Sequence, residues 1–159
     1  MSGRVQSTTV LPTGYAEVMR LDLQNDKKTA LWLNVAAAGV AVGMVAAAAL
    51  LGHSLLTMFD FSRGMGAYFL RFGVLLVGIL AYIVLHEAVH GVAMKCCLRA
   101  PVRFGFTGLY AFAGSDAYYA KRDYIFIALA PIVFWGIVLT VLTAVADSSW
   151  FWVVYFVQV

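Results

Sequence analysis

Long uncharged stretches alternate with polar ones along the chain, and this pattern predicts helices that cross a membrane. Residues 30–51 and 124–146 carry no charge, and each run is long enough to span a bilayer as a helix. A helix is also expected over about residues 68–94, which are apolar except for a few side chains. Residues 150–159 contain two tryptophans near their start, typical interfacial anchors, and predict the beginning of a fourth helix.

The connection over residues 95–123 has a different pattern from the helices on either side of it. Its stretch "VRFGFTGLYAFAGSDAYY" repeats glycine and aromatic residues with partial alternation, which indicates a hairpin or small sheet. We expect this hairpin or re-entrant segment to lie at the membrane or to dip into it. Irregular backbone at that depth must be covered by protein or face water.

Residues 1–29 are polar and mixed in charge, and they precede the first apolar run. Four of them have a spacing that fits a short interfacial helix, and an exposed tail fits equally well: Tyr15, Val18, Met19 and Leu23. The chain is therefore predicted to be an all-α integral membrane protein. It has three full transmembrane helices, the start of a fourth and a cytoplasmic-side hairpin, and it divides into an N-terminal segment, 1–29, and a transmembrane domain, 30–159.

The composition supports the membrane interpretation and excludes one class of function. Hydrophobic residues make up 63% of the 159 residues and charged residues only 12%, whereas soluble domains carry about a quarter charged residues. A domain of this size leaves much of its surface exposed, so the apolar residues need a lipid bilayer as their surroundings. No basic patch with interleaved aromatic residues is present, so nucleic acid is not an expected partner.

The distribution of Lys and Arg predicts the orientation. They gather in the N-terminal segment and in the connection after the second helix: Arg4, Arg20, Lys27, Lys28, Lys95, Arg99, Arg103, Lys121 and Arg122. The connection after the first helix has only Arg63 and the flanking Arg71, and the one after the third helix has none. The positive-inside rule places the N-terminus and the hairpin in the cytoplasm, as expected for a bacterial inner-membrane protein.

The stretch "VLHEAVHG" places three polar side chains inside the second apolar segment. Residues four apart on a helix lie on one face, so His86 and His90 can bind one metal ion. Two neutral imidazoles with an open position suit a catalytic zinc, which lowers the pKa of its bound water towards about 7. Glu87, beside the first ligand, can take the proton of that water and later give it to a leaving amine. The expected cofactor is one Zn²⁺ ion.

The membrane setting strengthens this interpretation of the motif. An acidic side chain at the centre of a membrane helix costs on the order of 2.5–3.5 kcal/mol on insertion scales, so such residues usually mark function. Glu87 lies eight residues before Lys95, which places it roughly 12 Å along the helix from the cytoplasmic boundary. The alternative is that the three side chains pair with other helices or line a polar cleft for structural reasons.

The motif and its surroundings resemble a known family. "LHEAVHGVAMK", the Gly- and aromatic-rich connection and "FIALAPIVF" are similar to the zincin peptidase family of small bacterial membrane proteins. They resemble more distantly the site-two protease group of intramembrane zinc metalloproteases, over roughly residues 68–140. The resemblance implies that His86 and His90 are metal ligands and that Glu87 is the catalytic acid and base. It also implies that Gly91 allows tight packing behind the site and that the hairpin pairs with an extended substrate.

The third metal ligand is left open by the sequence. The site-two group draws an aspartate from a later transmembrane helix, and this chain has no clear equivalent. Asp116 and Asp123 lie on the expected cytoplasmic side, although Asp116 also fits a turn residue and Asp123 a solvated boundary charge. A residue beyond Val159, on the continuation of the fourth helix, is a further candidate, and the chain would then be truncated.

Three functions compete at this point. The first is a membrane-embedded zinc endopeptidase that cleaves membrane-anchored proteins or peptides near the cytoplasmic side. The second is a non-catalytic membrane scaffold or adaptor with a vestigial or incomplete metal site. A small transporter or metal-handling channel ranks last, because the sequence has one intramembrane acidic cluster and no visible inverted repeat. The substrate, the cleavage site, the biological process and self-association into a homo-oligomer are left open.

Overall fold

The computed structural model describes residues 6–16, 18, 26–106 and 111–158. Within these residues the fold is mostly helical, with four α-helices, one short 3₁₀ helix and one two-stranded sheet. Three of the α-helices are long and apolar enough to cross a membrane: α1 (Lys27–Leu50), α2 (Met65–Cys97) and α3 (Lys121–Val145). The fourth is the short α4 (Phe151–Gln158). The predicted order of helices is confirmed, and the predicted hairpin between the second and third helices is present as the two-stranded sheet.

Both of the first two long helices extend beyond the apolar runs that predicted them. α1 begins at Lys27 because Asp26 caps it: the Asp26 carboxylate accepts a hydrogen bond from the Thr29 N–H, 3.1 Å away. A hydrogen bond from the Thr29 hydroxyl, together with this one from the backbone, lowers the pKa of Asp26 below its ordinary value. α2 has 33 residues, or about 50 Å of helix, which exceeds the thickness of a hydrocarbon core. In a bilayer its ends would therefore project into the interfaces, or the helix would tilt.

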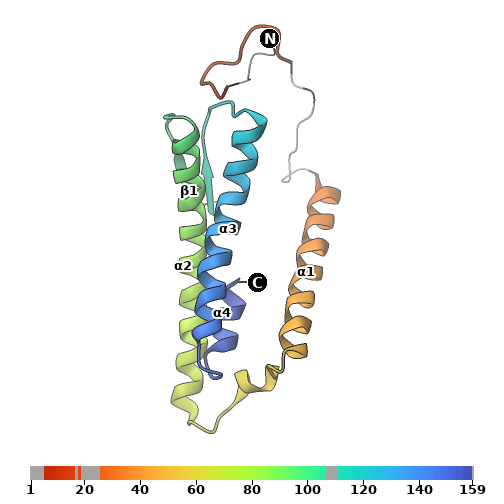
Figure 1. The fold of residues 1–159 in the computed structure, drawn as a ribbon, viewed down its shortest axis with the longest axis vertical. Coiled ribbons are helices and arrows are strands. Elements are labelled where there is room, and N and C mark those ends of the chain that lie inside the picture. The colour runs from red at the N-terminus through yellow and green to blue at the C-terminus, as the bar shows by residue number, and fades with distance from the viewer. Residues whose placement is uncertain (1–5, 17, 19–25, 107–110, 159) are drawn as a thin grey trace.

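Helices α2, α3 and α4 pack together, as Figure 1 shows, and α4 lies against the other two near the end opposite the hairpin. The short helix η1 (Leu55–Phe59) joins α1 to α2 at that end. Trp152 donates from its Nε1 to the Ser54 carbonyl, 2.8 Å away, and Tyr155 donates to the Met44 carbonyl at 2.7 Å. α4 thus ties α1 and η1 to the bundle.

A small hydrophobic core lies at these contacts, and the outer faces of the long helices are apolar. The core contains residues from α1, η1 and α4: Ala48, Met58, Phe151 and Trp152. Outside it, large apolar side chains on α2 and α3 remain exposed, for example Val77 at 66% and Ile137 at 62%. Apolar faces of this extent are expected of helices that meet lipid instead of water.

The connection between α2 and α3 forms a hairpin, as the sequence predicted. Strands β1 (Arg103–Phe106) and β2 (Ala111–Gly114) pair antiparallel, with Phe104 opposite Ala113. The turn residues, 107–110, lie outside the described residues. Both strands contact α2, so the hairpin lies against the helix that carries the motif.

Part of the N-terminal segment is attached to the same region. Thr8 and Tyr118 exchange backbone hydrogen bonds at 2.9 and 2.8 Å. The Ser7 hydroxyl donates to the Asp123 carboxylate at 2.5 Å and accepts from the Ala120 N–H at 2.9 Å. The described part of residues 6–16 contains no helix. The predicted interfacial helix falls mainly on residues 17 and 19–25, which lie outside the described residues.

Candidate metal centre

His86, Glu87 and His90 lie together on α2, as the motif predicted. One ligand atom from each of the three side chains can be chosen so that all lie within 4.8 Å of one another. The two imidazole rings have centroids 5.1 Å apart and meet edge to face. All three residues are half-buried, which leaves the cluster partly open and mostly surrounded by protein.

The ring of His90 is held by α3. Its Nδ1 lies 2.9 Å from the backbone carbonyl oxygen of Ile127. A carbonyl oxygen only accepts hydrogen bonds, so Nδ1 must carry the proton and donate it. In the neutral ring the lone pair is then on Nε2, the tautomer in which Nε2 can bind a metal ion.

The ring of His86 is held by Tyr82, one helical turn earlier on α2. The Tyr82 hydroxyl lies 3.1 Å from Nδ1 of His86, and the Tyr82 ring also packs edge-on against Trp135 of α3. If Nε2 of His86 held a metal ion, Nδ1 would carry the proton and would donate a hydrogen bond to the tyrosine oxygen. Both imidazoles therefore have a partner at Nδ1.

The carboxylate of Glu87 contacts the hairpin. One of its oxygens, Oε2, accepts a hydrogen bond from the backbone N–H of Ala113 in β2, 2.7 Å away. In an antiparallel pair, consecutive residues of a strand point their N–H groups alternately toward the partner strand and away from it. The N–H of Ala113 therefore faces away from β1, and the hairpin can orient Glu87 without losing a bond between its own strands.

Gly91 permits the hairpin to lie this close to the helix. The Phe104 ring of β1 packs directly on Gly91, and a Cβ atom at that position would overlap the ring. The tight packing behind the site that the sequence resemblance implied is therefore present.

The donor set fits zinc. Two imidazoles with their Nδ1 atoms engaged match the nitrogen ligands that zinc prefers. The Glu87 carboxylate beside them is placed to act on a metal-bound water, so the group supplies two of the three protein ligands of a typical catalytic zinc site. Among the residues that the structure describes, no further His, Cys, Asp or Glu joins the group.

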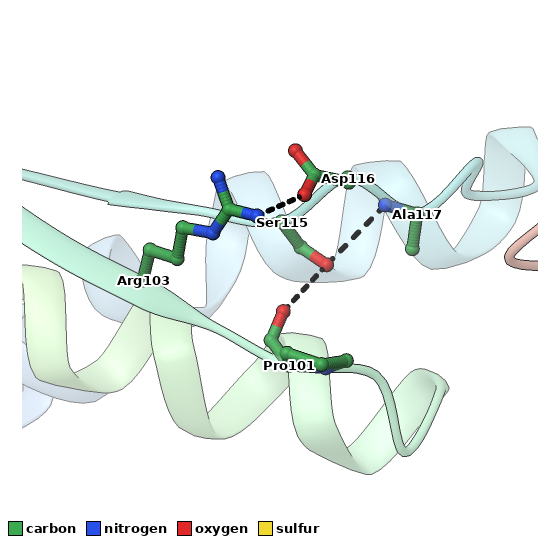
Figure 2. Close-up of polar contacts among 5 residues, drawn as sticks. All are labelled: Pro101, Arg103, Ser115, Asp116 and Ala117. Carbon is green, nitrogen blue, oxygen red and sulfur yellow. Dashed lines mark hydrogen bonds and ion pairs between the residues drawn. The ribbon is translucent and has the colours of Figure 1, made fainter.

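The two aspartates considered as a third ligand have other partners. Asp116 forms an ion pair with Arg103 at 2.6 Å, and its side chain is 80% exposed (Figure 2). Beside it, Ser115 donates to the Pro101 carbonyl and accepts from the Ala117 N–H, which makes the turn that the sequence also allowed. Asp123 accepts from Ser7. Neither aspartate belongs to the His–Glu–His group.

Two backbone groups at the site could not be named from the motif. They are the Ile127 carbonyl and the Ala113 N–H, which bind His90 and Glu87. A backbone group has no sequence signature of its own, so only the fold could identify them. Pro131, four residues after Ile127, is the one local signal, because a proline leaves the carbonyl four residues earlier without its helical donor.

Residues 79–159, just over half of the chain, match a protein family described as "Putative zincin peptidase". The chain belongs to this family. The matched region contains the His86–Glu87–His90 group, the hairpin, α3 and α4, whereas α1 and η1 precede it. No curated protein and no solved structure matches the chain. Membership of this family suggests a metallopeptidase and implies zinc as its metal, in agreement with the donor set.

Proposed function

We propose that the protein is a membrane-embedded zinc endopeptidase that cleaves membrane-associated proteins or peptides near the cytoplasmic side. His86 and His90 would hold the ion, and Glu87 would be the catalytic acid and base. The observation that carries the proposal is the convergence of the three side chains on one face of a helix long and apolar enough to span a bilayer. An acidic group in such a helix is costly to insert into a membrane, so such residues usually mark function.

When bound, zinc supplies a Lewis acid and lowers the pKa of water towards about 7. The residues of the chain do the rest. The two imidazoles orient the site through Nε2, because Tyr82 and the Ile127 carbonyl occupy their Nδ1 atoms. Glu87 takes up a proton at its carboxylate and returns it to the leaving amine. Oε2 is held by the Ala113 N–H, so the other oxygen is the better placed for proton transfer.

The hairpin is the proposed binding site for the substrate backbone. Within the described residues each strand of the two-stranded sheet has one neighbour, and β2 lies next to Glu87. An extended segment that runs beside β2 would gain main-chain hydrogen bonds from edge groups other than the Ala113 N–H, which Glu87 occupies, without a demand for a particular sequence. A helical substrate would have to unwind first, because a helix uses its own backbone groups internally.

The test is the Glu87→Gln variant of the full chain in lipid nanodiscs. Glutamine keeps the size of the side chain and removes its ability to accept a proton, so we expect zinc to be retained and peptide cleavage to fall by at least about 100-fold. Zinc is measured by elemental analysis, and cleavage with a membrane-anchored reporter peptide. Asp116→Asn is the matched control, because it makes the same chemical change at an exposed carboxylate outside the group. It should leave both measurements unchanged.

Three other results would refute the proposal. Full cleavage by Glu87→Gln would exclude the role of Glu87. A parent protein that holds zinc but cleaves no membrane-anchored reporter would favour the scaffold with a vestigial site. A parent protein without bound zinc would remove the metal centre itself.

A further inference from the structure

Helix α3 contains a proline where a helix ordinarily avoids one. Pro131 lies inside α3, about a third of the way along its apolar run, and is one of the most completely buried side chains of the described residues. Proline has no N–H, so it leaves the carbonyl four residues earlier without its usual donor. That carbonyl belongs to Ile127, itself only 5% exposed. A buried carbonyl without a donor is unfavourable, so another donor is needed there.

The donor comes from the metal centre. Nδ1 of His90 lies 2.9 Å from the Ile127 oxygen. The carbonyl that the proline frees is thus the one that receives the imidazole N–H of a proposed ligand. The position of the proline therefore matters, because a proline one residue earlier or later in α3 would free a different carbonyl.

We infer that Pro131 is a positioning residue, which keeps the Ile127 carbonyl available so that His90 is held as the Nδ1–H tautomer with Nε2 free for metal. Its effect on metal binding rests on the proposed zinc function, whereas its effect on the His90 tautomer does not. With any other residue at position 131, a backbone N–H would compete with His90 for the same oxygen. The helix would also lose the distortion that the proline ring imposes.

Pro131→Ala is the primary test, because it restores the N–H and favours a regular helix. Pro131→Val restores the same N–H but keeps a larger side chain than alanine at this buried position. An effect shared by both variants therefore comes from the regained N–H and not from lost packing. Gly136→Ala is the control: it also raises the helix propensity of α3, and a Cβ at Gly136 meets no atom within 4 Å. All are made in the full chain in nanodiscs.

Two measurements are needed. The zinc dissociation constant is obtained by competition with a chelator. The tautomer of His90 is read in zinc-free protein by ¹⁵N NMR, at a pH where the imidazoles are neutral. We expect both Pro131 variants to bind zinc about 10- to 100-fold more weakly, the usual effect of losing a group that orients a metal ligand. They should also shift His90 from the Nδ1–H towards the Nε2–H tautomer, with Gly136→Ala unchanged in both measurements.

The inference is overturned if His90 keeps the Nδ1–H tautomer in both Pro131 variants. It is also overturned if Gly136→Ala weakens zinc binding as much as they do, because the effect would then belong to the helix as a whole. If the parent protein binds no zinc and its His90 tautomer still depends on Pro131, the peptidase proposal fails while the positioning role of Pro131 stands.

Discussion

At the scale of the residue, each polar side chain of the centre has one partner that fixes it. The Tyr82 hydroxyl, for example, lies 3.1 Å from Nδ1 of His86. The motif alone identified the three central residues, because their spacing and chemistry are local. It could not identify the partners of His90 and Glu87, because these come from α3 and β2, which are distant in sequence.

Tyr82→Phe tests the partner of His86 by removing one oxygen atom and little volume. Because Nδ1 of His86 would lose its acceptor, we expect about 10-fold weaker zinc binding. Chelator competition measures the change. Tyr119→Phe is the matched control, since the buried hydroxyl of Tyr119 has no hydrogen-bond partner among the described residues. Unchanged zinc affinity with a much lower turnover in Tyr82→Phe would instead support a role for Tyr82 at the reacting oxygen.

At the scale of the element, hydropathy located the helices well and their ends less well. α2 extends three residues beyond the predicted 68–94 at each end. Polar residues there are tolerated because side chains such as Lys95 can reach the interface from a helical backbone. The hairpin could be predicted from its alternation, whereas its contact with Glu87 depends on how the strands pack on α2. From the position of Pro131, the sequence identifies the freed carbonyl but not the side chain that binds it.

Ala113→Pro tests the contact between the hairpin and Glu87. The N–H of Ala113 points away from β1, and proline is tolerated where the N–H of an edge strand takes no part in the ladder. The hairpin should therefore persist, whereas Glu87 loses the group that orients it. We expect zinc to be retained and kcat/KM for the reporter peptide to fall about 10- to 100-fold.

Phe112→Pro provides the contrast. The N–H of Phe112 points toward β1, so its loss should disrupt the hairpin. Equal activity of Ala113→Pro and the parent would rule out the orienting role.

At the scale of the whole molecule, the site lies on α2 towards the end where the hairpin, the described start of the chain and the beginning of α3 meet. The opposite end consists of η1 and the turn between α3 and α4, and its charged residues are few. The two ends therefore differ in both structure and charge. If the positive-inside rule holds for this chain, the candidate metal centre faces the cytoplasm. The substrate segments that we propose it cleaves would then lie on the cytoplasmic side of the membrane as well.

The native cysteines can test this orientation, because Cys96 and Cys97 lie on the last turn of α2, beside the hairpin. A membrane-impermeant maleimide added to intact cells that express the protein should leave them unlabelled, and it should label the exposed Cys96 in inverted membrane vesicles. Ser148→Cys, in a background with both native cysteines replaced by serine, places a thiol in the exposed turn between α3 and α4. It should show the reverse pattern. Labelling of Cys96 in intact cells, with Ser148→Cys protected, would show the opposite orientation. The centre would then face substrates outside the cell.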